Sequence, residues 1–124
     1  MITFTNLTSK PIRRGVFQKI YKKVMPKVYD LSVVFAPPAL MRKLNETYRK
    51  KDKAANVLAF FYGKLRLGGR TAKWSGEIFL NVKERDLPHL FAHGCLHFLG
   101  YDHKTAQEAR VMEEKEQNVL KKVG

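Results

Sequence analysis

The spacing of three histidines near the C-terminus is the feature that most constrains the fold. His93 and His97 are four residues apart, so on an α-helix their side chains project only about 40° apart and can reach the same ion. Gly100 allows the chain to leave the helix sharply, and the next two residues can bring His103 back toward the same side. Three neutral imidazoles with an open fourth position are typical of a catalytic zinc site. The sequence therefore predicts one zinc ion per chain, bound by His93, His97 and His103.

The residue after the first histidine limits the reaction that such a site can perform. The spacing resembles the metzincin protease pattern H-E-x-x-H-x-x-G-x-x-H, but Gly94 stands where those proteases have Glu. That Glu is the general base of peptide hydrolysis, and a positioned base contributes roughly 10²–10⁴-fold. Phosphodiester cleavage remains open, because zinc lowers the pKa of its bound water toward ~7 and a nearby cation can stabilise the charged transition state.

Three neighbours of the predicted ligands are candidates for a functional or a purely structural role. His89 lies one helical turn before His93 and can contact substrate or a ligand, although an isolated histidine is more often simply exposed. Asp102 adjoins His103 and can orient a histidine, although a loop Asp often forms only an Asx-turn. Cys95 projects about 200° away from His93 and is expected in the core. Because it is the only cysteine, we expect a reducing compartment and no disulfide-linked partner.

Positive charge is concentrated in the first part of the chain. Residues 1–73 carry 17 of the 24 Lys and Arg residues and three acids, a net charge of +14, whereas residues 74–124 carry seven and eight, a net charge of −1. A concentrated positive field favours a polyanionic partner, either nucleic acid or an anionic membrane surface. A solvated lysine-rich face is the plainer alternative. The candidates for docking an RNA backbone are Arg13, Arg14, Lys22, Lys23, Lys50 and Lys51.

Hydrophobic periodicity divides the chain into about four strands and four helices in mixed order. Alternating or β-branched apolar runs predict the strands, and apolar residues repeated every three to four positions predict the helices. Asp86 is suited to cap the helix that carries the histidines. Predicted strands cover residues 2–6, 31–35, 56–62 and 74–82, and predicted helices cover 11 to about 23–26, 39–49, 87–99 and 104–123. We therefore expect one α+β domain, residues 1–124, with one mixed sheet packed against helices.

No segment of the sequence has the features of a membrane span. The longest apolar stretch, residues 33–41, is interrupted by Pro37 and Pro38 and is far shorter than the ~20 residues that a spanning helix needs. Residues 1–10 lack the apolar run of a signal peptide. Together with the single cysteine, these features predict a soluble cytoplasmic protein without a membrane partner.

Separate blocks of the sequence resemble the YbeY family of bacterial ribosomal RNA maturation factors and endoribonucleases. Residues 93–103 match the pattern H-G-x-L-H-x-x-G-Y-D-H. Residues 44–53 are similar to the family segment L-N-x-x-Y-R-x-K-D-x, and residues 56–60 and 76–78 to its T-D-V-L-S-F and G-D-I strands. The departures are Ala55, Asn56 and Ala59 in place of Thr, Asp and Ser, Glu77 in place of Asp, and a shorter segment before the zinc helix.

The resemblance implies a zincin-like fold, in which a zinc-binding helix packs against the sheet, and a single-strand-specific, zinc-dependent endoribonuclease. It also implies work on small-subunit ribosomal RNA, in its maturation and in ribosome quality control, with the small ribosomal subunit as a partner. Arg49 stands at the position of a family arginine implicated in activity, so we expect its guanidinium to hold the scissile phosphate, with Arg49 and His93 as the catalytic residues. Without the resemblance, Arg49 would be interpreted as one more solvated cation of a basic turn.

Two other functions remain open. A ribosome-assembly factor would bind RNA around a structural metal without cleaving it. A metallopeptidase would take its general base from elsewhere, with Glu77 and Asp102 as candidates. A water at an open metal position would argue against the assembly factor, and a phosphate or sulfate bound near Arg49 would argue against the peptidase.

Overall fold

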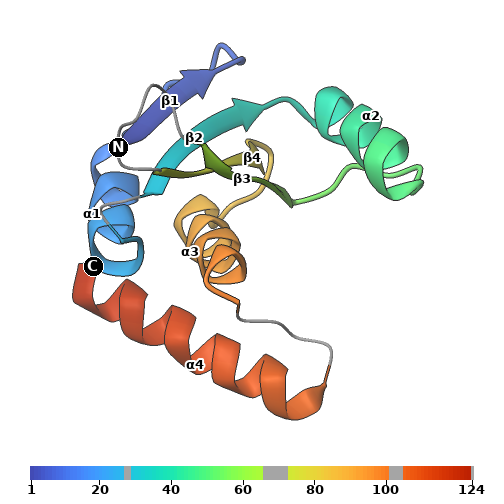
Figure 1. Ribbon diagram of the computed structural model, residues 1–124. Helices are drawn as coiled ribbons and strands as arrows, with labels where there is room; N and C mark the ends of the chain where they lie inside the picture. The colour runs from blue at the N-terminus through green and yellow to red at the C-terminus, as the bar shows by residue number, and fades with distance from the viewer. Residues whose placement is uncertain (27–28, 66–72, 101–104, 124) are drawn as a thin grey trace.

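Four strands and four helices follow one another in mixed order along the described part of the chain (Figure 1). The computed structural model describes residues 1–26, 29–65, 73–100 and 105–123. The strands are β1 (Ile2–Asn6), β2 (Tyr29–Ala36), β3 (Val57–Leu65) and β4 (Lys73–Asn81), and the helices are α1 (Gly15–Val24), α2 (Pro38–Arg49), α3 (Leu87–Phe98) and α4 (Ala106–Val123). The prediction of an α+β fold with one mixed four-stranded sheet is confirmed.

The sheet combines parallel and antiparallel pairing. Its strands lie in the order β1-β2-β4-β3. β1, β2 and β4 are parallel, and β3 pairs antiparallel with β4 at the edge. Parallel neighbours need a long crossover connection, and α1 lies in the crossover from β1 to β2.

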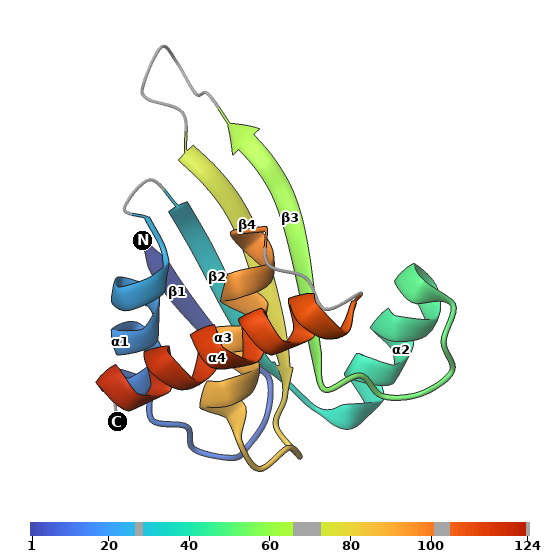
Figure 2. The ribbon, with the colours of Figure 1, turned by 90° about the horizontal axis from the view of Figure 1, so that it is seen from below.

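Three helices lie on one side of the sheet. α3 packs against β3 and β4, and both α1 and α4 pack against α3; Figures 1 and 2 show α3 between the sheet and α4. Phe17 of α1 meets Phe35 of the sheet and Phe91 of α3 with ring centroids 5.2 and 5.5 Å away. All three rings are buried, and this core fixes the position of the helix that carries the predicted ligands.

Two glycines allow α3 to lie close to β4. A Cβ atom on Gly94 of α3 would be 3.1 Å from Cδ1 of Ile78, and a Cβ atom on Gly76 of β4 would be 2.9 Å from Cζ of Phe98. Both distances are shorter than ordinary van der Waals contact, so a larger residue at either position would force its neighbours to shift. Packing against the sheet therefore accounts for Gly94, at the position where metzincin proteases have Glu.

The opposite face of the sheet is covered at one end by α2. Met41 of α2 packs with Ala36 of β2 and Leu58 of β3, and Phe79 of β4 lies against them. Because side chains alternate along a strand, this second small core uses the residues of β2, β3 and β4 that point away from α3.

The predicted start of the first helix is wrong. The helix begins at Gly15 rather than at Pro11, although Ile12 still packs against the core from the non-helical segment before it. An apolar residue in helical register can thus reach the core without belonging to the helix. The other elements agree with their predicted bounds to within three residues. None of the described helices is long and apolar enough to cross a membrane.

Candidate metal centre

Helix α3 holds His93 and His97 in its last two turns. Its first turn is stabilised by Asp86, whose carboxylate accepts a hydrogen bond from the backbone N–H of His89 at 3.2 Å. The chain leaves the helix at Gly100, which has a φ of 94°, a conformation that glycine adopts without strain. The predicted cap and the predicted stop of this helix are confirmed.

His93 and His97 face each other across one helical turn. Their Nε2 atoms are 3.0 Å apart and their ring centroids are 4.6 Å apart. Two imidazole nitrogens that bind one tetrahedral zinc ion at ~2.0–2.1 Å lie about 3.3 Å from each other. The two side chains therefore fit a shared zinc ion with an adjustment of only about 0.3 Å.

A buried carboxylate from α4 supports the histidines. Glu116 is 3% exposed. Its Oε1 lies 2.5 Å from Nδ1 of His93, and its Oε2 lies 2.7 Å from Nε2 of His89. Histidines that bind a metal commonly donate their other N–H to a carboxylate, which fixes the ring orientation and the tautomer. A proton on Nδ1 of His93, donated to Glu116, leaves the lone pair of Nε2 on the side of His97.

The charge state of Glu116 suits this role. Burial by itself raises the pKa of the Glu116 carboxyl, but hydrogen bonds and charge interactions with His93, and then with His89, outweigh burial and hold the pKa below its usual range. The group is therefore a carboxylate at neutral pH and accepts hydrogen bonds from both rings.

Sequence reasoning missed Glu116. The residue interrupts the apolar stripe of α4, in which Met112 and Val119 are buried. A carboxylate at a core-facing position is costly unless it is paired. A single acid among apolar residues on one helix face was therefore the available signal of a buried partner.

The structure describes two of the four remaining residues of the predicted site and its surroundings. The structure brings His89 to Glu116, so it stands beside the histidine pair rather than apart from it. His103 and Asp102 lie outside the described residues. Within the described ranges, no group of three or more His, Cys, Asp and Glu side chains is arranged to bind a metal, so the predicted zinc site depends on His103. Cys95 is buried, as expected.

Glu77 lies on the other side of the sheet from the histidines. Its neighbours in β4, Gly76 and Ile78, contact α3, and side chains alternate along a strand. Glu77 instead accepts hydrogen bonds from the hydroxyls of Ser32 at 3.1 Å and Tyr62 at 2.8 Å. These contacts give it a structural role in the sheet, and the structure does not bring it to the histidine pair.

Arg49 and two predicted docking lysines lie at one end of the molecule. Arg49 is the last residue of α2, and Lys50 ends the helix with a φ of 56°. Both side chains and that of Lys51 are exposed. The described contacts of the histidine pair are with each other and with Glu116, so the catalytic role of Arg49 stays a prediction.

The remaining docking candidates lie at the opposite end of the sheet, on and next to α1 (Figures 1 and 2). Arg13 and Arg14 precede this helix, and Lys22 and Lys23 lie in its last turn. The structure thus separates the predicted docking residues into two groups rather than one continuous patch.

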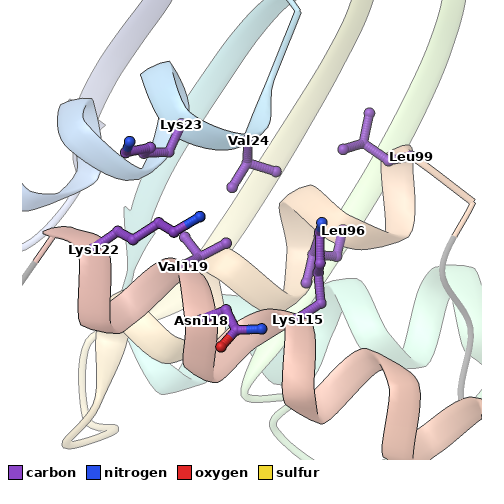
Figure 3. A pocket seen from close by; sticks show the side chains of 8 residues that line it. All are labelled: Lys23, Val24, Leu96, Leu99, Lys115, Asn118, Val119 and Lys122. Carbon is purple, nitrogen blue, oxygen red and sulfur yellow. The ribbon is translucent and has the colours of Figure 1, made fainter.

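Lys23 also lines a groove that the sequence did not predict. The groove has a volume of about 310 Å³ and lies between α1, α3 and α4 (Figure 3). Helix α4 contributes Lys115 and Lys122 to it. Its apolar lining consists of Val24, Leu96, Leu99 and Val119. These two lysines belong to residues 74–124, the nearly neutral part of the sequence, but in the structure they lie close to the positive charge of α1.

Comparisons with known proteins agree with the fold and identify a family. The family model described as Endoribonuclease YbeY matches residues 4–124. The chain is 38% identical over 126 residues to Endoribonuclease YbeY of Chelativorans sp. (strain BNC1), covering 88% of this chain and 75% of the relative. It is 40% identical over 115 residues to that of Anaplasma marginale (strain Florida), covering 82% and 70%.

The fold has a counterpart among solved structures. The solution structure of TM1509 from Thermotoga maritima matches with a TM-score of 0.61 over 99% of this chain and 89% of that one, at 21% sequence identity. An identity this low supports the fold alone. The family model and the curated relatives carry the assignment: this chain belongs to the Endoribonuclease YbeY family.

Proposed function

We propose that this protein is a single-strand-specific, zinc-dependent endoribonuclease that acts in the maturation of small-subunit ribosomal RNA and in ribosome quality control. Membership of an endoribonuclease family supports RNA cleavage. Within the chain, the observation that carries the proposal is the pair of Nε2 atoms of His93 and His97, 3.0 Å apart and supported by the buried carboxylate of Glu116.

His93, His97 and His103 would hold the zinc ion. When bound, zinc supplies a Lewis acid and a water of lowered pKa. Glu116 would keep the proton on Nδ1 of His93, so that Nε2 keeps its lone pair for the metal. Gly94 offers no carboxylate for peptide hydrolysis, which disfavours the peptidase alternative.

Positive side chains would bind and position the RNA. Arg49 would hold the scissile phosphate through paired N–H donors, and the basic groups at α1 and at the end of α2 would bind the phosphate backbone. The high positive charge of residues 1–73 supports such a partner. The place of action would be the cytoplasm, with the small ribosomal subunit as the partner.

The test is cleavage of a single-stranded ribosomal RNA fragment by the zinc-loaded chain, beside the same sequence as a duplex. We expect cleavage of the single strand and about one zinc per chain by elemental analysis. His93→Ala, His97→Ala and His103→Ala should each lose the zinc and the cleavage. Cys95→Ala should keep both, because Cys95 is buried in the core.

Contaminating nuclease is the main hazard with a protein of net charge +13. The His97→Ala variant, purified in parallel, controls for it, and cleavage at the parent's rate by this variant would contradict the nuclease assignment. RNA binding without cleavage by the zinc-loaded parent would favour the ribosome-assembly factor. Zinc retained by His103→Ala but lost from Cys95→Ala would show that the ligand assignment is wrong.

A further inference from the structure

Two aromatic rings are stacked on the surface near the histidine helix. The rings of Phe61 in β3 and Trp74 in β4 have centroids 5.7 Å apart and an interplanar angle of 28°. Phe61 is 56% exposed and Trp74 is 37% exposed. Adjacent aromatic rings that are partly exposed on a small protein commonly mark a binding surface.

The pair lies on the same face of the sheet as α3. Phe61 is the register partner of Gly76, and Gly76 faces Phe98 of α3. The rings of Phe61 and Phe98 are 6.4 Å apart, and Phe98 directly follows His97 in the chain. We call Phe61, Trp74 and Phe98 the aromatic platform. Figure 2 shows β3 and β4 extending past the C-terminal end of α3.

Charge close to the platform in sequence favours a polyanion over an apolar protein surface. Residues 64–73, which follow Phe61 and lead into Trp74, carry four Lys and Arg residues and no acid. Exposed aromatic rings in a part of the sequence rich in positive charge are the combination with which proteins bind single-stranded nucleic acids, since cations meet phosphates and rings stack on bases.

We propose that Phe61 and Trp74 form a stacking site for unpaired bases of single-stranded RNA beside the histidine pair. This inference rests on the proposed endoribonuclease function and adds a physical cause for strand selection. In a duplex the bases are already stacked on one another, whereas unpaired bases can splay out and stack on aromatic side chains. The platform thus favours single strands without reading their sequence, because every base has a π-face.

The chain carries its own reporter for the test, because Trp74 is the only tryptophan. The fluorescence of the full-length His97→Ala variant, chosen to keep the RNA intact, is titrated with a single-stranded oligoadenylate and with a blunt RNA duplex of equal length. We expect the single strand to quench Trp74 and the duplex to quench it much less. Anisotropy of a dye-labelled oligoadenylate measures the affinity independently.

A neighbouring residue offers a matched control. Tyr62 is 55% exposed, nearly the same as Phe61, but its hydroxyl bonds to Glu77 on the opposite face of the sheet. Phe61→Ala should weaken oligoadenylate binding roughly 10-fold, whereas Tyr62→Ala should leave it nearly unchanged. Trp74→Phe keeps an aromatic ring and should retain most of the affinity that Trp74→Ala loses, which separates stacking from a general loss of folding.

The outcomes distinguish failure of the proposed stacking site from failure of the proposed nuclease function. Binding seen by anisotropy without any change in Trp74 fluorescence would overturn the platform, as would equal effects of Phe61→Ala and Tyr62→Ala or equal quenching by the duplex. Quenching by single strands, with a parent chain that binds but does not cut, would support the platform while contradicting the nuclease. Absence of RNA binding at this surface would leave a protein partner as its occupant and would overturn the inference.

Discussion

The Nδ1 atom of His93 lies 2.5 Å from the Oε1 atom of Glu116. This contact joins α3 to α4 through two residues that are 23 positions apart in sequence. The two ring nitrogens of His93 therefore have different partners. Nδ1 contacts the carboxylate, and Nε2 faces His97. A predicted ligand is thereby held in one orientation before any metal arrives, which reduces the cost of ordering it on binding.

The first prediction concerns this carboxylate. Glu116→Gln should weaken zinc binding about 10- to 100-fold, because a neutral amide stabilises the ligand rings less well than a buried carboxylate does. The measurement is competition for zinc with a chromogenic chelator. Glu114→Gln is the matched control, since Glu114 lies on the exposed side of the same helix. Equal affinities of the two variants would show that Glu116 does not support the metal.

The second prediction concerns Arg49. If its guanidinium neutralises charge that develops only during cleavage, Arg49→Ala should lower kcat by about 10²–10³-fold while weakening RNA binding much less. Arg49→Lys keeps the charge but loses the planar fork, so it should recover activity only in part. Lys43→Ala, an exposed cation of the same helix, should change neither. Loss of binding and kcat in equal measure would mean that Arg49 only docks the phosphate.

The third prediction concerns Cys95. The side chain is fully buried, and burial raises the pKa of its thiol far above the usual value. Since the thiolate is the reactive form, the native protein should react with a thiol-specific disulfide reagent at pH 8 only as fast as it unfolds. Protein unfolded in guanidinium should react at once with one equivalent, because the chain has one cysteine. Fast reaction of the native protein would be incompatible with a core position.

The fourth prediction concerns pH. Tyr62 is about half-exposed, and its partial burial, followed by the hydrogen bond to Glu77, raises its pKa from 10.0 to about 12. A group whose pKa is raised on folding stabilises the folded state fully below its unfolded pKa, so this contribution is present below pH 10 and is lost as the pH rises toward 12.

Replacing the carboxylate tests this assignment. Glu77→Gln should lower the pKa of Tyr62, but not fully to 10.0, because burial remains. The measurement is the ultraviolet absorbance of tyrosinate against pH, and Tyr62→Phe identifies which part of the titration belongs to this residue. An unchanged titration in Glu77→Gln would remove the carboxylate as a cause.

The sequence predicted correctly those features of the structure that depend on neighbouring residues alone. The periodicity of residues 39–49, the Asp86 cap and the Gly100 stop depend on backbone propensity and on contacts within a few residues, so they could be read along the chain. The first helix shows the limit of this approach. Ile12 follows the helical spacing but reaches the core from outside the helix, because burial selects an apolar residue whatever the local backbone does.

The sequence alone determined the class of the fold, the helix that carries His93 and His97, the concentration of positive charge in residues 1–73 and the family to which the chain belongs. Only the tertiary structure placed Glu116 against His93, moved Glu77 to the far face of the sheet and brought Phe61, Trp74 and Phe98 together. Spacing within one helix is fixed by its 3.6-residue repeat. Contacts between elements depend instead on how sheet and helices pack, and that is set by burial summed over the whole core rather than by any short segment.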